Sequence, residues 1–423
     1  MSNHPATQRA MIAAVQILGL SVWFSATAVV PSLSADWQIT SGQAVWLTAS
    51  VQLGFVCGAL TSALLNLADR IKPSYLLAAS TAAAATCTLV FALVCDSFAT
   101  GVPLRFLTGV FLAGIYPVGM KLTASWSTSA NRGMAFGLLI GALTLGSALP
   151  HLISGLGELP WRAVMASAAA VALLAAVVSA VFITSGPNLA PQTARPNVRY
   201  LVEMFRQRGP RLANLGYVGH MWELYAWWTW LAIYLSHALG GDLAHRGAEL
   251  ITFAAIGVAG FVGCLLGGLA ADRFGRSRAA VVAMVVSGCC CVLSPLLFGA
   301  PPWLLVPFLA VWGVAVIADS GVFSTALSET SDARYVGTAL TAQTAIGFTL
   351  TVVSIQLVPL LVELVGWRYA FLILAPGPLL GAIAMHRFQA IEPSRRNEEE
   401  HHAVSNQDRP DCRSDGGAVA HSR

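Results

Sequence analysis

The chain has 423 residues, of which 56% are hydrophobic and only 10% are charged, and its formal net charge at pH 7 is +4. One soluble core of this length cannot bury so much apolar surface, so the composition excludes a soluble globular protein. Apolar stretches long enough to cross a hydrocarbon core of about 30 Å as helices recur along the chain, and they predict an all-α membrane protein.

Twelve membrane spans are predicted from these apolar stretches. In chain order they cover residues 10–33, 44–68, 75–95, 101–126, 135–157, 161–183, 212–237, 248–271, 279–299, 303–328, 338–362 and 367–388. When the N-terminus is placed in the cytoplasm, most arginine and lysine residues of the loops fall on the cytoplasmic side, as the positive-inside rule requires. We therefore expect a multi-pass protein of a bacterial inner (plasma) membrane with both termini in the cytoplasm.

The longest interior break between the spans divides the chain near its midpoint. It covers residues 184–211 and holds four prolines among several arginines, a composition that predicts a cytoplasmic linker. The domains are then an N-terminal six-helix bundle at 1–183 and a C-terminal six-helix bundle at 212–388. Residues 389–423 are polar and rich in charge, and they are predicted to form a disordered cytoplasmic tail.

Several short patterns occur twice, half a chain apart. An Asp-Arg pair follows the second predicted span at 69–70 and the eighth at 272–273, and Trp-Arg opens the sixth span at 161–162 and the twelfth at 367–368. Chance rarely aligns such features at one offset, so an internal duplication is indicated. Because each half has an even number of spans, the two bundles are expected to run parallel, with pseudo-two-fold symmetry about the membrane normal.

The stretch 268–278 resembles the loop signature of the major facilitator superfamily: a glycine, apolar residues, Asp-Arg, and a glycine followed by basic residues. The resemblance covers roughly residues 10–388, and it implies the fold and the transport activity of that superfamily. It also implies a gating loop made of Gly268, Asp272, Arg273, Gly275 and Arg276, with Asp69 and Arg70 as a degenerate first copy. Alternatively, these arginines only enforce the topology.

Another part of the chain is similar to the superfamily's fourth-helix motif, a buried arginine followed by a glycine, which Arg105 and Gly109 match. The resemblance implies either a structural role for this arginine or a link to proton transfer. The Gly-Pro pair typical of drug-proton antiporters is missing from the fifth span, which counts against drug export.

The seventh predicted span carries an acid, an imidazole and large aromatic residues on one helical face. His220, Glu223, Trp227 and Trp230 fall within an arc of about 80° at 3.6 residues per turn. An ionised carboxylate facing lipid costs about 2.5–3.5 kcal/mol, so Glu223 must face the interior or stay protonated. We predict that this face lines a central cavity and that Glu223 carries a coupling proton. A backbone carbonyl that satisfies His220, or an interfacial position for Trp230, is the structural alternative.

Three further residues inside spans are candidates for the same cavity. Asp319 lies within the tenth span, where it can pair with Arg105, with His220 or with a coupling proton, or it can simply join two helices. Gln16 and Trp23 are seven residues apart and therefore share one face of the first span.

The sequence therefore predicts a monomeric secondary transporter that moves a small organic solute through the bilayer by alternating access, coupled to protons. A cavity with several tryptophans and few charges favours a flat aromatic or heterocyclic solute. A drug or metabolite efflux antiporter is the first alternative, and a non-transporting membrane sensor or assembly factor is the second. We predict no enzyme activity, cofactor, metal or nucleic-acid partner. No nucleophile-base arrangement or phosphate-binding loop is present, and the eight cysteines lack metal or redox spacing.

Overall fold

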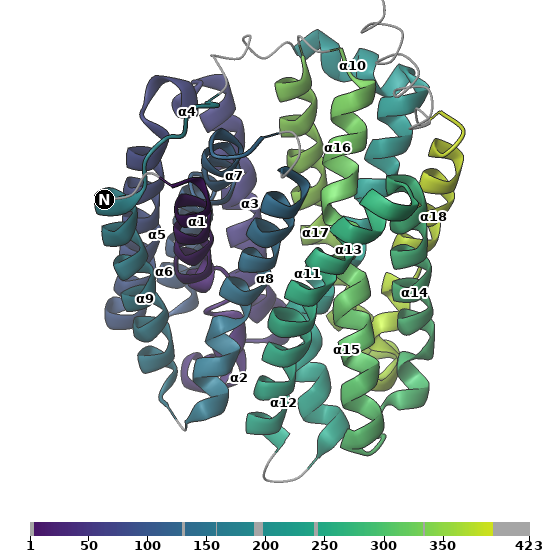
Figure 1. Cartoon of the computed structure of the whole chain (residues 1–423). Helices are drawn as coiled ribbons and strands as arrows, with labels where there is room; N and C mark the ends of the chain where they lie inside the picture. Colours follow the sequence, from purple (N-terminus) through teal and green to yellow (C-terminus); the bar gives the residue numbers. More distant parts are fainter. Residues whose placement is uncertain are drawn as a thin grey trace, which may run out of the picture.

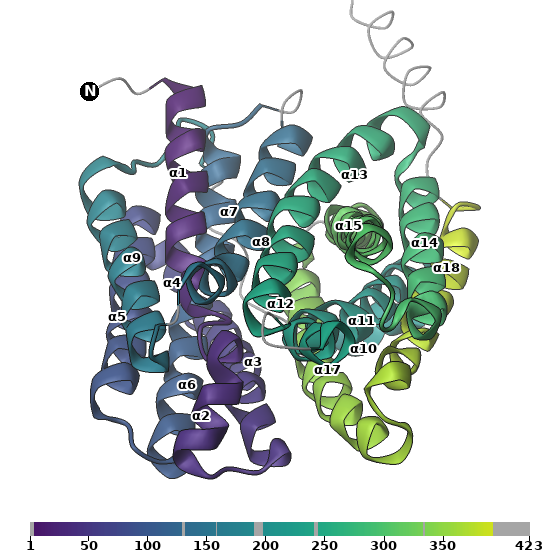
Figure 2. The same ribbon diagram turned by 90° about the horizontal axis from the view of Figure 1, so that it is seen from below.

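The computed structural model describes residues 4–128, 132–157, 159–189, 198–240, 244–332 and 335–391, and these residues form helices without any strand. Figure 1 shows two helical bundles side by side, one purple to blue and the other teal to yellow. The view from below in Figure 2 separates the same two bundles. The protein is thus an all-α membrane protein of two six-helix bundles with pseudo-two-fold symmetry.

The first bundle holds spans one to six, of which the first and the fourth are broken. Its elements are α1 (Pro5–Gly19), η1 (Leu20–Val22), η2 (Thr27–Val29) and α2 (Val30–Trp37) for span one, α3 (Ser41–Leu64) with the short α4 (Leu67–Arg70), α5 (Pro73–Val94), α6 (Phe98–Leu112) and α7 (Tyr116–Ser125) for span four, α8 (Arg132–Leu156), and α9 (Trp161–Phe182).

The second bundle follows α10 (Val198–Arg206) and holds spans seven to twelve. Its elements are α11 (Arg208–Leu239), then α12 (Ala244–Thr252), the π-helix η3 (Phe253–Ala259) and α13 (Gly260–Phe274) for span eight, α14 (Arg276–Leu297), α15 (Pro302–Ala318) and α16 (Ser320–Thr330) for span ten, α17 (Val336–Val365), and η4 (Trp367–Leu374) with α18 (Pro376–Phe388) for span twelve.

Ten helices of the described chain are long and apolar enough to cross a membrane, and the bent pair formed by span one, with a 46° bend, makes an eleventh. The remaining span is α11, which has 32 residues. Its Trp, Tyr, His and Glu residues lower its hydropathy, and most of its side chains are buried against other helices. A helix that is mostly buried against other helices can carry polar and aromatic residues across a membrane, so α11 completes the twelve spans.

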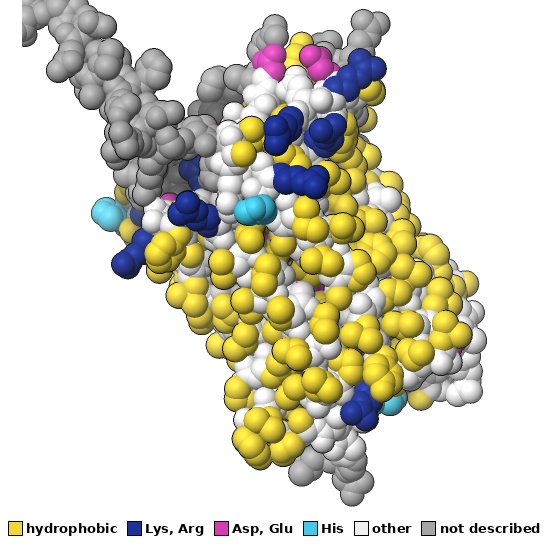
Figure 3. Space-filling model, turned by 90° about the vertical axis from the view of Figure 1, so that its right-hand side faces the viewer, with side chains coloured by type: hydrophobic (Ala, Val, Ile, Leu, Met, Phe, Trp, Pro, Cys, Tyr) yellow, Lys and Arg dark blue, Asp and Glu magenta, His cyan; other side chains and the backbone are white. Residues whose placement is uncertain are grey.

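The outer surface of the second bundle is suited to contact with a lipid bilayer. Figure 3 shows hydrophobic side chains over the middle of this face and Lys and Arg gathered toward its upper end. The exposed apolar residues include Leu266, Val282, Val292, Leu296 and Leu379. Such an exposed apolar belt is expected where side chains contact lipid, whereas in water it would be an aggregation hazard.

The helices agree with the predicted spans to within a few residues at most ends. The pattern did not predict the breaks at 23–26, at 113–115 and at Asp319. The division at 184–211 stays a prediction, and α10 is a helix within that segment. Residues 190–197 of the segment and residues 392–423 of the predicted tail lie outside the described residues.

Close helix crossings repeat in both bundles. A Cβ atom on Gly54 of α3 would lie 2.0 Å from the carbonyl oxygen of Phe106, and one on Gly267 of α13 would lie 1.9 Å from that of Ala318. Spans two and four, and likewise spans eight and ten, therefore approach as closely as only glycine permits. In the second bundle this glycine is Gly267 and not the signature's Gly268, where an added Cβ meets nothing within 4 Å.

Candidate functional site

Arg105 of α6 is fully buried and holds the broken first span. Its guanidinium donates to the carbonyl oxygens of Val22 at 3.1 Å, Trp23 at 2.5 Å and Leu47 at 3.2 Å, and to the Ser25 hydroxyl at 3.2 Å. The break leaves backbone carbonyls without helical donors, and a fixed fork of N–H groups can satisfy several of them at once. All four acceptors belong to the first bundle, so this arginine acts on the backbone there.

Glu223 of α11 is buried inside the second bundle. Its Oε1 atom accepts hydrogen bonds from the Ser287 hydroxyl at 2.5 Å, the Trp312 indole at 2.7 Å and the Cys291 thiol at 3.3 Å. Ser287 and Cys291 lie on α14, and Trp312 lies on α15. These contacts direct the carboxylate into the second bundle and not toward the boundary with the first.

His220 and Asp319 form a buried pair within the second bundle. His220 Nδ1 lies 2.8 Å from Asp319 Oδ1, and both side chains are 3% exposed. Ser320 Oγ lies 3.0 Å from the other ring nitrogen of His220. Asp319 stands at the break between α15 and α16. Of the partners considered for Asp319, the structure therefore places His220 beside it, joining α11 to the broken tenth span.

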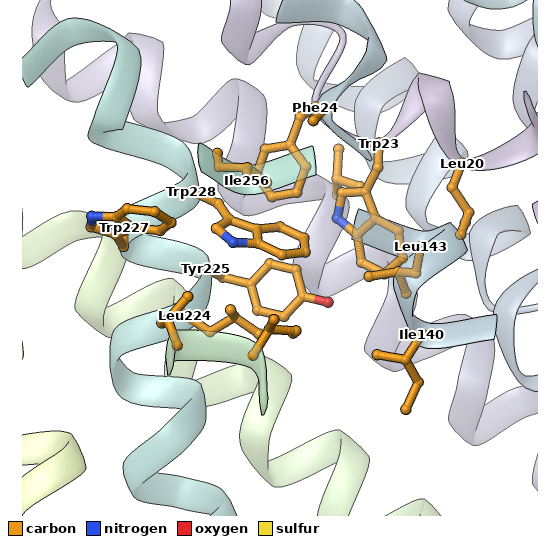
Figure 4. Close-up of a cluster of buried hydrophobic side chains, with 14 of the residues drawn as sticks. Leu20, Trp23, Phe24, Ile140, Leu143, Leu224, Tyr225, Trp227, Trp228 and Ile256 are labelled. Atoms are coloured by element: carbon orange, nitrogen blue, oxygen red, sulfur yellow. The ribbon is translucent and has the colours of Figure 1, made fainter. Parts of the chain in front are cut away.

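Six aromatic rings meet where the two bundles touch, and we call them the aromatic seam. They are Trp23, Phe24 and Phe55 from the first bundle and Tyr225, Trp228 and Phe348 from the second. The Trp23 ring centroid lies 5.8 Å from those of Tyr225 and Phe348, and the Phe55 centroid lies 4.4 Å from that of Phe348. Figure 4 shows Trp23, Phe24, Tyr225 and Trp228 converging from the two sides.

Two polar groups in this region have no hydrogen-bond partner among the described residues. They are the indole Nε1 of Trp23 and the side-chain amide of Gln52, both fully buried. Gln52 lies three residues before Phe55 and so shares its face of α3. An unpaired buried polar group costs about 1–3 kcal/mol, so these groups are suited to a polar partner that is not part of the chain.

The other predicted cavity residues point in different directions. Gln16 donates to the carbonyl of Ile115 at 3.0 Å, at the break between α6 and α7, while Trp23 joins the seam. These two side chains of span one thus contact different neighbours. Trp230 donates to the carbonyl of Ile355 at 2.9 Å.

Trp227, also on α11, packs inside the second bundle, where its ring is tilted against that of Trp312 at a centroid distance of 5.2 Å. The structure therefore brings His220 together with Asp319, and Glu223 and Trp227 together with Trp312. These two groups are separate contacts of α11 with the tenth span.

The second-bundle loop signature connects elements of one bundle. Gly275, with φ of +94°, joins α13 to α14, a backbone conformation that favours glycine. Arg276 forms an ion pair with Glu329 of α16, and the Arg273 guanidinium lies 5.4 Å from the centre of the Phe274 ring. Sequence reasoning did not identify Glu329 as the partner.

The first copy of the signature lies in and around α4. Arg70 is exposed at the end of this short helix, and the side chain of Asp69 lies outside the described residues. Asp272 stands in the last turn of α13.

One buried pair joins the two bundles directly. His151 Nδ1 of α8 lies 2.6 Å from Glu249 Oε2 of α12, and the two side chains are 1% and 3% exposed. His151 lies within the predicted fifth span and Glu249 at the start of the predicted eighth span, and neither is among the site residues predicted from the sequence. A search for acids and histidines at span ends could have found Glu249. Among the described residues, no three His, Cys, Asp or Glu side chains gather as a metal site.

A family model described as Major Facilitator Superfamily matches residues 12–355. A probable sulfoacetate transporter, SauU of Cupriavidus necator, is 27% identical over an alignment of 227 residues, and the match covers 47% of this chain and 51% of that protein. The match thus spans about half the length of this relative. The fold is also similar to that of the xylose transporter XylE from E. coli in a partially occluded inward-open conformation. The TM-score is 0.71 at 15% identity, covering 93% of this chain and 99% of the other.

Proposed function

Since the chain belongs to the major facilitator superfamily and is a membrane transporter of that type, we propose that it moves a small organic solute with a flat, unsaturated body by alternating access, coupled to protons. The bilayer is a bacterial inner membrane in this proposal, and the end that carries α10 faces the cytoplasm. The transporter acts as a monomer.

The aromatic seam is the observation that carries this proposal. Its rings come from both bundles, so a rocking motion of one bundle against the other separates Trp23 from Tyr225 and Phe348 and opens a slot with aromatic walls. A flat solute can replace ring-ring contacts with ring-solute contacts of similar strength. The unpartnered indole N–H of Trp23 and amide of Gln52 supply hydrogen bonds for a polar edge of the solute.

The His220–Asp319 pair is the coupling site in this proposal, with Glu223 second. A proton on Asp319 removes the charge that faces the imidazole, at the point where the tenth span is broken. The change in pairing alters the relative stability of the two arrangements of α15 and α16. Glu223, by contrast, is held by three donors and has a stable set of partners within its bundle.

A small organic anion without a ring is the second candidate solute, because the relative from Cupriavidus necator is described as a probable sulfoacetate transporter. An anion needs a cation in the binding region. The buried guanidinium of Arg105 already donates to four acceptors of the first bundle, which favours a solute with little charge over a compact dianion.

Uptake by the purified protein in liposomes tests the proposal. The probes are labelled benzoate, nicotinate and uracil, with sulfoacetate as the small anion, under a proton gradient of either direction. We expect a flat probe to accumulate under one gradient direction, which also separates import from efflux. Accumulation of sulfoacetate alone would favour the second candidate. Binding of a probe without flux under any gradient would favour a sensor.

Trp23→Phe keeps an aromatic ring, though a smaller one, and removes the indole N–H. We expect it to raise the half-saturating concentration of the transported probe about tenfold, the effect of one hydrogen bond of about 1.4 kcal/mol. Trp37→Phe is the matched control, because Trp37 also has an unpartnered buried Nε1 among the described residues but packs against Phe91 and Trp161, away from the seam. Equal effects of the two substitutions would contradict the proposed site.

A further inference from the structure

We propose that the second bundle binds one anionic phospholipid in a groove on its outer surface, with an acyl chain along the groove and the headgroup held by Arg387 and Arg208. The groove begins near the end of the molecule that carries α10 and the start of α11. This end is cytoplasmic in the proposed function, but the binding itself requires no solute transport.

Three helices form the groove. Helices α17 and α18 both pack against α11, whereas within the described chain they hardly touch each other. The space between them has a volume of about 450 Å³. Large apolar side chains line it, among them Leu212, Leu215 and Trp222 of α11, Leu350 of α17, and Leu380 and Ile383 of α18.

The groove has the depth of one leaflet of a bilayer. Leu212 and Trp222 stand ten residues apart on α11, which is about 15 Å at 1.5 Å per residue. A hydrocarbon core is about 30 Å thick, so this length is half of it. Leu380 and Ile383 are exposed on the outer surface of the bundle, and a chain can therefore enter the groove sideways from the bilayer.

The inner end of the groove presents no free hydrogen-bond donor from Trp222. The indole of Trp222 donates to the carbonyl oxygen of Ile373 in η4 at 2.9 Å, so its ring contributes only apolar surface. A hydrocarbon chain suits such a lining, because it loses no hydrogen bonds on entering, whereas a polar solute would.

The end near the start of α11 is basic. Arg387 lines the groove in the last turn of α18, is exposed, and has no hydrogen bond or ion pair with any described residue. Arg208 is also exposed and precedes Leu212 and Leu215 at the spacing i, i+4, i+7, which puts it on the same face of α11. The first turn of α11 has no acidic residue, and α18 has none at all.

This combination favours an anionic phospholipid over other occupants. Guanidinium groups bind phosphate oxygens through paired N–H donors, and two of them attract a headgroup with net negative charge. A zwitterionic headgroup brings a cation of its own, which the two arginines repel. Residues 392–423 are too polar in sequence to supply the apolar chain.

Native mass spectrometry of the full chain, released from detergent micelles, counts bound lipids and tests the site. The probes are phosphatidylglycerol and phosphatidylcholine with identical oleoyl chains. We expect one tightly retained phosphatidylglycerol. Its dissociation constant should rise about fivefold in Arg387→Gln and about 25-fold in the double variant Arg208→Gln, Arg387→Gln, while that of phosphatidylcholine stays unchanged. Arg278→Gln is the control, because Arg278 is exposed in the first turn of α14 and does not line the groove.

A second pair of variants tests the groove with both arginines in place. Leu380→Trp fills the groove and is expected to weaken retention of phosphatidylglycerol about tenfold, whereas Leu379→Trp changes an exposed neighbour outside the groove and should leave it unchanged. All these substitutions replace exposed side chains, so the fold is expected to persist.

Three results would overturn the site: equal retention of the two lipids, equal effects of Leu379→Trp and Leu380→Trp, or a dimer of the chain in place of the bound lipid. Absence of solute flux in liposomes would count only against the transport proposal, since lipid retention is measured without solute.

Discussion

In each bundle, a side chain of the fourth helix donates hydrogen bonds to buried polar groups of the first helix. The acceptors are backbone carbonyls in the first bundle and a carboxylate side chain in the second. In the first bundle, Arg105 on the fourth span supplies donors to the carbonyls of a broken span one. In the second, Trp312 on the tenth span donates to Glu223 of an unbroken α11. The difference shows that a duplicated architecture can keep its helix crossings while the polar groups buried in its two halves diverge.

The two helices also differ in what stabilises their shape. Span one is held through its backbone, so its shape depends on one side chain from another helix. In contrast, α11 keeps its own backbone hydrogen bonds over 32 residues and offers side chains to its neighbours. The seam thus joins a broken helix, which carries Trp23, to a continuous one, which carries Tyr225.

The largest expected effect comes from removing the Arg105 guanidinium, which donates hydrogen bonds to the broken span one of the first bundle. Arg105→Leu removes four buried hydrogen bonds from a charged donor, at about 1.5–3 kcal/mol for each, and their sum approaches the whole stability of about 5–15 kcal/mol of a typical protein. We expect loss of a monodisperse peak in fluorescence-detected size-exclusion chromatography. Arg162→Gln, which removes a partly exposed ion pair with Asp96, should change the melting temperature little. A normal peak for Arg105→Leu would show that the break is held by other means.

A smaller effect is expected from the matching change in the second bundle. Glu223→Leu removes the acceptor of the Trp312 indole, the Ser287 hydroxyl and the Cys291 thiol, at about 1–3 kcal/mol for each group left unpaired, while the α11 backbone stays intact. Glu223→Gln keeps an acceptor oxygen and should lose less.

Thermal unfolding of the purified protein measures the difference, with the exposed Glu363→Gln as the control. If Glu223→Gln also leaves the pH dependence of transport unchanged, Glu223 is structural. A shift in the pH dependence of transport would support a role for Glu223 in proton coupling.

The smallest of the three effects tests the close helix crossings that both bundles contain. Gly267→Ala would place a methyl group 1.9 Å from the carbonyl oxygen of Ala318, so the helices must shift at a cost of about 1–3 kcal/mol. Gly54→Ala should cost about as much in the first bundle, where the Cβ atom would lie 2.0 Å from the carbonyl of Phe106. Gly268→Ala, with open space around it, is the control. Equal melting temperatures for all three variants would argue against the close crossings.

Much of the fold could be predicted because each span is a local apolar run. The predicted twelfth span, 367–388, coincides with η4 and α18. The break in span one was not predictable, since Trp23 and its neighbours have ordinary helical composition and Arg105, far away in the chain, stabilises the broken form. The shared face of Gln16 and Trp23 stays a prediction, because the neighbours of each side chain depend on how distant helices pack.

For the candidate site, the period of α11 correctly put Glu223 and His220 on a buried face but left the neighbouring helices undefined. The sequence offered Arg105 and His220 as partners of Asp319, and only helix packing placed His220 beside it. The seam residues Tyr225 and Trp228 were missed because they lie on the other face of α11 from Glu223.

The sequence by itself determined that this is a membrane protein, how many spans it has, and that its halves are related, because hydropathy, length and repetition are properties of neighbouring residues. Only the tertiary structure decided which polar groups meet. His151 and Glu249 are 98 positions apart and belong to different bundles. Helical periodicity indicates a face, but the partner on that face depends on how distant helices pack.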